Sequence, residues 1–226
     1  MKTLGLLAVG QSPRLDYGPV IRALAGPSVH VTEKGLLDGL SREEMEALAP
    51  RSSSEHPVIS RLDDGSSVVM SKSLLTGLVN AKLREFSAEG VDVAVLMCTG
   101  AFEGVVCPKS LTLLSGRDII DGCVRAAVPA GSRLGALVPL ASQEAFTGRK
   151  FEDMGYEVVT AHASPYGDRA ELERAAVTLR GCGAVVLHCM GYTREHREFI
   201  AQASGAMVLQ SSALVGHVCA ELLSER

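Results

Sequence analysis

The chain has 226 residues, a formal net charge of −4 and a sequence pI near 5.9. That charge excludes the basic face that nucleic-acid binding requires, and a content of 46% hydrophobic against 21% charged residues excludes a disordered chain. The first apolar run, residues 6–9, is too short for a signal or membrane segment. We therefore expect a cytoplasmic protein that binds neither nucleic acid nor membrane.

Short apolar runs alternate with helical periodicity along most of the chain. The strands predicted from these runs are residues 4–9, 29–33, 58–62, 67–71, 91–97, 111–114, 134–139, 157–161, 184–188 and 206–209. The predicted helices are residues 17–25, a short helix capped by Ser41, 74–86, 118–128, 142–154, 168–179, 193–202 and a last helix from residue 211 or 212. The alternation favours an α/β fold with mainly parallel sheets, apart from one hairpin at residues 58–71. The turn at residues 128–132, "VPAGS", best divides the chain into halves.

Two of the six cysteines stand at the end of a predicted strand: Cys98 in "VAVLMCTGAF" and Cys189 in "AVVLHCMGYTREH". The other four are interpreted as structural: Cys107, Cys123, Cys182 and Cys219. No C-x-x-C pair occurs, so the pattern indicates neither a metal site nor a redox motif. Buried structural cysteines are common, and that interpretation stays open for Cys98 and Cys189 as well.

The position of these two thiols suggests chemistry. Ligands of open α/β sheets bind beyond the carboxyl ends of the strands, where backbone amides favour anions and lower a thiol pKa. One thiol from each half predicts a cleft with Cys98 and Cys189 on its two sides, which is the geometry of a racemase that needs no cofactor. One thiolate would remove the proton alpha to a carboxylate, and the other thiol would return one to the opposite face.

Further candidates for substrate binding follow the strands. Gln11 and Ser12 in "VGQSPRLD" fall at the end of the first strand, and Arg14 could clamp a carboxylate in bidentate fashion. Thr99 offers a hydroxyl and Gly100 an unhindered amide. A plain strand-to-helix turn explains each segment equally well.

In the second half, Gly191 repeats the place of Gly100 in a Cys-x-Gly sequence. Ser211 and Ser212 could face the same cleft, although helix capping alone also accounts for them. His188 is expected to point away from the side of Cys189 and to pack in the core, because side chains alternate along a strand.

Three segments carry a family resemblance: "TLGLLAVGQSPR", "GLLDGLSREEMEALAP" and "HCMGYTREHREFIAQASGAMVLQSSALVGHVCAELL". Over nearly the whole chain, the sequence resembles the AroM protein family, which is similar to the aspartate/glutamate/hydantoin racemase superfamily. This resemblance implies two Rossmann-like lobes, an active site between them and one cysteine from each lobe. Cys98 and Cys189 would take those places.

The resemblance also implies a domain organisation. Residues 1–130 would form the first lobe, with an insert at about 36–71 and completion by the C-terminal helix 211–226, and residues 131–210 the second. The insert would cover the cleft or form a contact in a homodimer.

Together these features predict a cofactor-independent racemase, epimerase or isomerase that acts on a small carboxylate or amino-acid-like ligand. A decarboxylase that uses a single cysteine is one alternative, and a non-catalytic ligand-binding or regulatory protein on the same scaffold is another. A cysteine hydrolase is a weaker one, because it would need a histidine within reach of Cys189.

Overall fold

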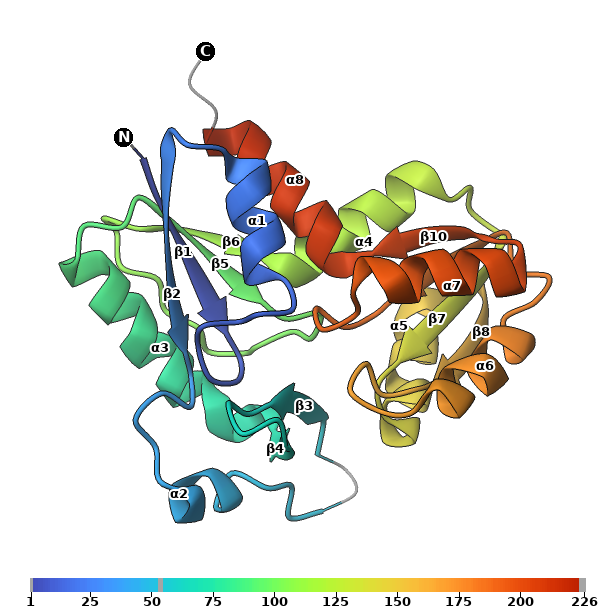
Figure 1. Ribbon diagram of the computed structural model, residues 1–226, viewed down its shortest axis with the longest axis horizontal. Coiled ribbons are helices and arrows are strands. Elements are labelled where there is room, and N and C mark those ends of the chain that lie inside the picture. The colour runs from blue at the N-terminus through green and yellow to red at the C-terminus, as the bar shows by residue number, and fades with distance from the viewer. Residues whose placement is uncertain (1, 53–54, 224–226) are drawn as a thin grey trace. The chain divides into compact units, whose positions relative to one another are not determined.

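The computed structural model describes residues 2–52 and 55–223, which fall into two compact units. The first unit runs from the N-terminus to Arg117 and includes the C-terminal segment from Val215, while the second spans Asp118–Leu214. Each unit is built on its own parallel sheet (Figure 1). The predicted α/β class with mainly parallel sheets is therefore confirmed. None of the described helices is long and apolar enough to cross a membrane.

The sheet of the first unit has the strand order β2-β1-β5-β6. Its strands are β1 (Lys2–Ala8), β2 (Val29–Gly35), β5 (Val93–Met97) and β6 (Thr112–Ser115). Leu4, Leu6 and Leu7 of β1 are fully buried, as expected of a strand that is covered on both faces. Helix α3 (Lys72–Ala88) covers one face, while α1 (Gly18–Ala25) covers the other beside the end of α8 (Ser211–Leu223) (Figure 1).

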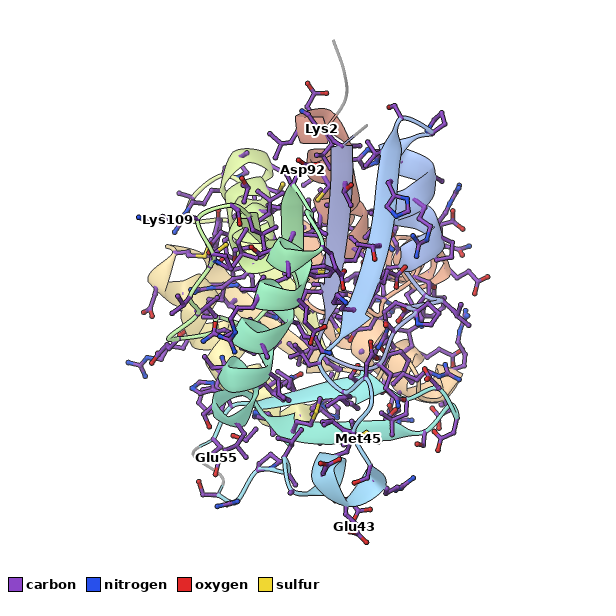
Figure 2. The ribbon with its side chains drawn as sticks, turned by 90° about the vertical axis from the view of Figure 1, so that its left-hand side faces the viewer. Lys2, Glu43, Met45, Glu55, Asp92 and Lys109 are labelled. Atoms are coloured by element: carbon purple, nitrogen blue, oxygen red, sulfur yellow. The ribbon has the colours of Figure 1, made fainter. Side chains whose placement is uncertain are left out.

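The segment between β2 and α3 forms the predicted hairpin, whose strands are β3 (Pro57–Arg61) and β4 (Ser67–Ser71). Before it comes the short helix α2 (Arg42–Glu46), which Ser41 caps through reciprocal hydrogen bonds with Glu44. Figure 2 shows Met45 on the side of α2 toward the hairpin and Glu43 on the opposite side. Met45 is buried in the core of the first unit, so this segment folds as part of that unit.

The second unit has a sheet of order β10-β9-β7-β8. Its strands are β7 (Arg133–Val138), β8 (Glu157–His162), β9 (Ala184–Leu187) and β10 (Met207–Gln210). Its helices are η1 (Ala141–Gln143, a 3-10 turn), α5 (Glu144–Asp153), α6 (Arg169–Thr178) and α7 (Arg194–Ser204), and the chain enters the unit within α4 (Gly116–Ala127) and leaves it within α8. Asp168 caps α6 by accepting a hydrogen bond from the Glu171 amide, at the residue where the predicted helix 168–179 begins.

The two sheets share one topology. In each unit the second strand lies on one side of the first strand and the third strand lies on its other side. The order in which the chain adds strands therefore changes direction at the neighbouring pair β1 and β5 in the first sheet, and at the pair β7 and β9 in the second. In open α/β sheets, such switch points are where ligands bind, beyond the carboxyl ends of the strands.

Candidate active site

Cys98 follows β5 directly and sits at the switch point of the first sheet. Register pairs Ala8 of β1 with Met97 of β5, so the chain segments after both strands leave the sheet side by side. The Cys98 amide donates to the carbonyl of Leu96 at 2.9 Å, which turns the chain sharply at the cysteine. The Gly100 amide then points at the Cys98 sulfur, with N and Sγ 3.4 Å apart. An amide so placed stabilises a thiolate.

Cys189 repeats this arrangement in the second unit. Its amide donates to the carbonyl of Leu187 at 2.9 Å, and the Gly191 amide lies 3.5 Å from the Cys189 sulfur. Leu187 pairs in register with Leu137 of β7, so Cys189 stands at the switch point of its own sheet. The Cys-x-Gly pattern seen in the sequence thus corresponds to one local geometry that occurs once in each unit.

The loop after Cys98 is held against α3. The Thr76 hydroxyl donates to the carbonyl of Glu103, and the side chain of Asn80 bonds the backbone of Gly104 and Val106. Thr99 and Gly100 begin this loop and are half-buried beside the cysteine. The sequence-predicted pair thus lies next to the sulfur.

The segment after β1 places Gln11, Ser12 and Arg14 at the same edge of the first sheet. The Ser12 amide and hydroxyl both donate to the Asp38 carboxylate, at 2.8 and 2.6 Å. The side-chain oxygen of Gln11 accepts from the Asp63 amide in the hairpin turn at 2.8 Å. The hydrogen bonds of these two predicted residues therefore stabilise the turn that follows β1.

Arg14 is 6% exposed and its guanidinium already has protein partners. It makes a bidentate ion pair with Asp16, donates to the Ser60 hydroxyl at 2.8 Å and lies over the ring of Tyr17. A cavity of about 610 Å³ adjoins these groups and is lined by Gln11, Pro13, Arg14, Leu15, Asp16, Arg61, Leu62, Asp63 and Gly65. The hairpin thus supplies one wall beside the predicted binding residues.

In the second unit, Ser211 and Ser212 hold the turn that contains Cys189. The Ser211 hydroxyl donates to the carbonyl of Leu187 at 2.6 Å, and the Ser212 hydroxyl to that of Tyr192 at 3.5 Å. Both serines are buried. Their bonds to the cysteine turn go beyond the capping role that the sequence suggested.

Tyr166 is a neighbour of this turn that sequence reasoning missed. Its ring lies so close to Gly191 that a Cβ there would overlap the phenol oxygen, so the glycine is required by this contact. Burial raises the pKa of nearby Tyr192 well above its usual range, and Cys189 adds to the effect. Tyr166 comes from a loop after β8, and only its position at the carboxyl edge of a predicted strand could have indicated it.

Lys72, the first residue of α3, was also missed. A Cβ on Gly100 would lie 3.6 Å from the Lys72 ammonium and 3.7 Å from the Cys98 sulfur. The lysine follows the predicted hairpin and precedes the first apolar residue of the predicted helix, so no sequence pattern joined it to the cysteine.

The remaining thiols and the histidine beside Cys189 lie in different surroundings. Burial raises the pKa of Cys107, Cys123 and Cys182, and raises that of Cys219 to about 11. None of the six cysteines, all within the described ranges, forms a disulfide. These four thiols, Cys107, Cys123, Cys182 and Cys219, are therefore disfavoured as thiolates at neutral pH.

His188 is buried against the Phe151 ring, and its Nε2 lies 3.2 Å from the Lys150 ammonium.

Several solved structures have similar folds. A maleate isomerase from Pseudomonas putida S16 aligns with 98% of this chain and 92% of its own, at a TM-score of 0.63 and 13% identity. The aspartate racemase of Picrophilus torridus aligns over 100% and 96%, at a TM-score of 0.61 and 13% identity. Arylmalonate decarboxylase aligns over 98% and 91%, at a TM-score of 0.59 and 15% identity. At these identities the likeness shows the class of fold alone, one that this chain shares with a racemase, an isomerase and a decarboxylase.

The amino-acid sequence identifies the family more specifically than the fold does. The AroM protein family matches residues 4–223, and the chain belongs to that family. Among curated protein sequences, no relative matches it.

Proposed function

We propose that this protein is a cofactor-independent racemase, epimerase or isomerase that moves a proton at the carbon alpha to a carboxylate. The observation that supports it most is the repeated turn. After the third strand of each sheet comes a cysteine whose sulfur lies 3.4 or 3.5 Å from a glycine amide. The similar folds of an aspartate racemase and a maleate isomerase add support, because their structures align with nearly the whole of this chain.

In the proposed reaction, Cys98 and Cys189 meet one substrate from opposite sides. The thiolate of one removes the α proton, and the thiol of the other donates its proton to the opposite face of the carbanion. The first residue ends as a thiol and the second as a thiolate, so protons and charge balance and the enzyme is ready for the reverse direction. The amides of Gly100 and Gly191 stabilise whichever sulfur is ionised.

We assign a small carboxylate or amino-acid-like ligand to this site. The residues proposed to bind it are Gln11, Ser12, Arg14, Thr99, Gly100, Gly191, Ser211 and Ser212. The hydroxyls of Ser12 and Ser211 already donate to protein oxygens, so toward a ligand they act as acceptors. Acceptors at those two positions suit the ammonium of an amino acid. The cytoplasmic location and the homodimer stay predictions.

The test is exchange of the α hydrogen in heavy water. Small carboxylates and amino acids are incubated with the protein, with Cys98→Ser, with Cys189→Ser and with Cys123→Ser as the matched control, and the α-proton signal is followed by NMR. We expect exchange with inversion in the wild type and in Cys123→Ser. Both site variants should lose inversion, because each lacks one of the two proton carriers.

Other outcomes identify the alternatives. Loss of carbon dioxide from a substituted malonate that depends on one cysteine alone would replace the proposal with a decarboxylase. Ligand binding without exchange, at the same affinity in both cysteine variants, would replace it with a binding or regulatory protein.

A further inference from the structure

Lys72 is held at a fixed place beside the Cys98 turn. Its amide donates to the carbonyl of His56 at 3.1 Å, and the amide of the preceding residue, Ser71, donates to that of Leu48 at 2.7 Å. Ser71 is fully buried. The first turn of α3 is therefore anchored at both residues, and the lysine side chain starts from a rigid base.

From that base the side chain extends over Gly100 toward the sulfur. The point where a Gly100 Cβ would stand is 3.4 Å from Lys72 Cδ, 3.6 Å from its Nζ and 3.7 Å from Cys98 Sγ. Because residue 100 is glycine, it places no side chain at this point between the ammonium and the thiol. Any other residue at position 100 would insert a carbon between the two groups.

Lys72 differs from the other half-buried lysines in its partners. Each of those pairs with a carboxylate: Lys34 with Glu89, Lys82 with Glu85 and Lys150 with Asp121. Within residues 2–52 and 55–223, the Lys72 ammonium has neither an ion pair nor a hydrogen-bond acceptor. A partly desolvated ammonium without a counter-ion favours a nearby anion.

The charged neighbours of the ammonium come from several elements. Burial lowers the pKa of Lys72, the Cys98 thiolate opposes that effect, Arg117 lowers the pKa further and Glu103 raises it. Burial and the Lys72 charge lower the pKa of His56, so this histidine is neutral at pH 7. The Lys72 ammonium thus interacts with one further cation, one carboxylate and the Cys98 thiolate.

We propose that Lys72 is the positioning residue that holds Cys98 as a thiolate before substrate binds. The thiol proton passes to solvent, Lys72 keeps its own proton, and the resulting ion pair stands at the switch point of the first sheet. The inference deepens the proposed function, because it makes Cys98 the base of the resting enzyme. It can be tested without knowing the substrate, because the ionisation state of the Cys98 thiol can be measured in the free protein.

The test is the pH dependence of alkylation by iodoacetamide, read separately at each cysteine by peptide mass spectrometry on the full chain. Lys72→Gln should raise the Cys98 pKa by about one unit, because it removes the Coulomb attraction between the lysine's positive charge and the nearby thiolate. Thiolate at pH 7 should then fall by up to about tenfold. Lys72→Arg keeps the charge and should restore most of the reactivity. Lys82→Gln, on the same helix, is the matched control, and Cys189 in the same sample is the internal one.

Glu103→Gln adds a test in the opposite direction, because removing that carboxylate should lower the Cys98 pKa. It also keeps the proposal testable if Lys72→Gln does not fold by circular dichroism. An unchanged Cys98 pKa in Lys72→Gln would overturn the proposal, as would an equal shift in Lys82→Gln or at Cys189. An unchanged Cys98 pKa in Glu103→Gln would overturn it too. Failure of the proposed function would appear instead as absent α-proton exchange with the Cys98 shift intact.

Discussion

Gly10→Ala tests how the hairpin is seated on the end of β1. A Cβ at this position would overlap the Ser60 hydroxyl of β3, lie 2.8 Å from Ser60 Cβ and 3.0 Å from Arg14 Nη1. Ser60 is 4% exposed and Arg14 6%, so neither can move aside into solvent. The methyl group must displace the hairpin or the guanidinium.

The size of the effect follows from those contacts. Overpacking a dense site costs about 1–3 kcal/mol. Breaking the Arg14–Ser60 hydrogen bond, which has a charged donor and is 2.8 Å long, costs about 1.5–3 kcal/mol. Alanine returns about 0.4–1 kcal/mol by restricting the unfolded chain. We expect Gly10→Ala to lower the free energy of unfolding by about 1.5–5.5 kcal/mol.

Urea denaturation followed by circular dichroism measures this loss. Gly77→Ala in the middle of α3 is the control: nothing lies within 4 Å of its Cβ, so it should stabilise by about 0.5–1 kcal/mol. Adding Ser60→Gly to Gly10→Ala should recover the overpacking part. A Gly10→Ala protein with the wild-type midpoint would refute the contact between β1 and the hairpin.

Three further predictions follow from single contacts. Gly100→Ala has ordinary contacts of 3.4 Å or more, so it should fold normally, yet slow alkylation of Cys98 by bulky reagents. Asp168→Ala should cost about 1 kcal/mol in urea denaturation, whereas Asp168→Asn, which keeps a capping oxygen, should cost little. Cys219 has a folded pKa of about 11 against 9.0 for a free thiol, so its neutral form stabilises the fold. That stability is complete below pH 9 and is lost toward pH 11, so Cys219→Ala should flatten the alkaline fall in thermal midpoint.

Much of the fold could be predicted because its signals are local. Apolar runs such as residues 4–9 and 184–188 mark strands buried on both faces, and Ser41 and Asp168 satisfy amide donors within their own first turn. The α2 helix shows the limit of such signals. Its capping box is clear in the sequence, but the helix ends after Glu46 because the chain turns back to build the hairpin.

The candidate site could be predicted only where chemistry coincides with a strand end. Cys98 and Cys189 carry that signal, and the structure puts each in the same kind of turn. The partners of Arg14 could not be foreseen, because Ser60 lies 46 residues away along the chain. Lys72 likewise comes near the thiol across Gly100, through tertiary packing that no periodicity encodes.

Cys98 and Cys189 are proposed to act on one substrate. Dibromobimane measures this most directly, because it becomes fluorescent only when both of its arms have reacted with thiols. We expect a fluorescent adduct that joins the peptides of Cys98 and Cys189, is absent in Cys98→Ser and in Cys189→Ser, and persists in Cys123→Ser. Separate single-arm adducts on the two cysteines of the folded wild type, with no joined peptide, would contradict it.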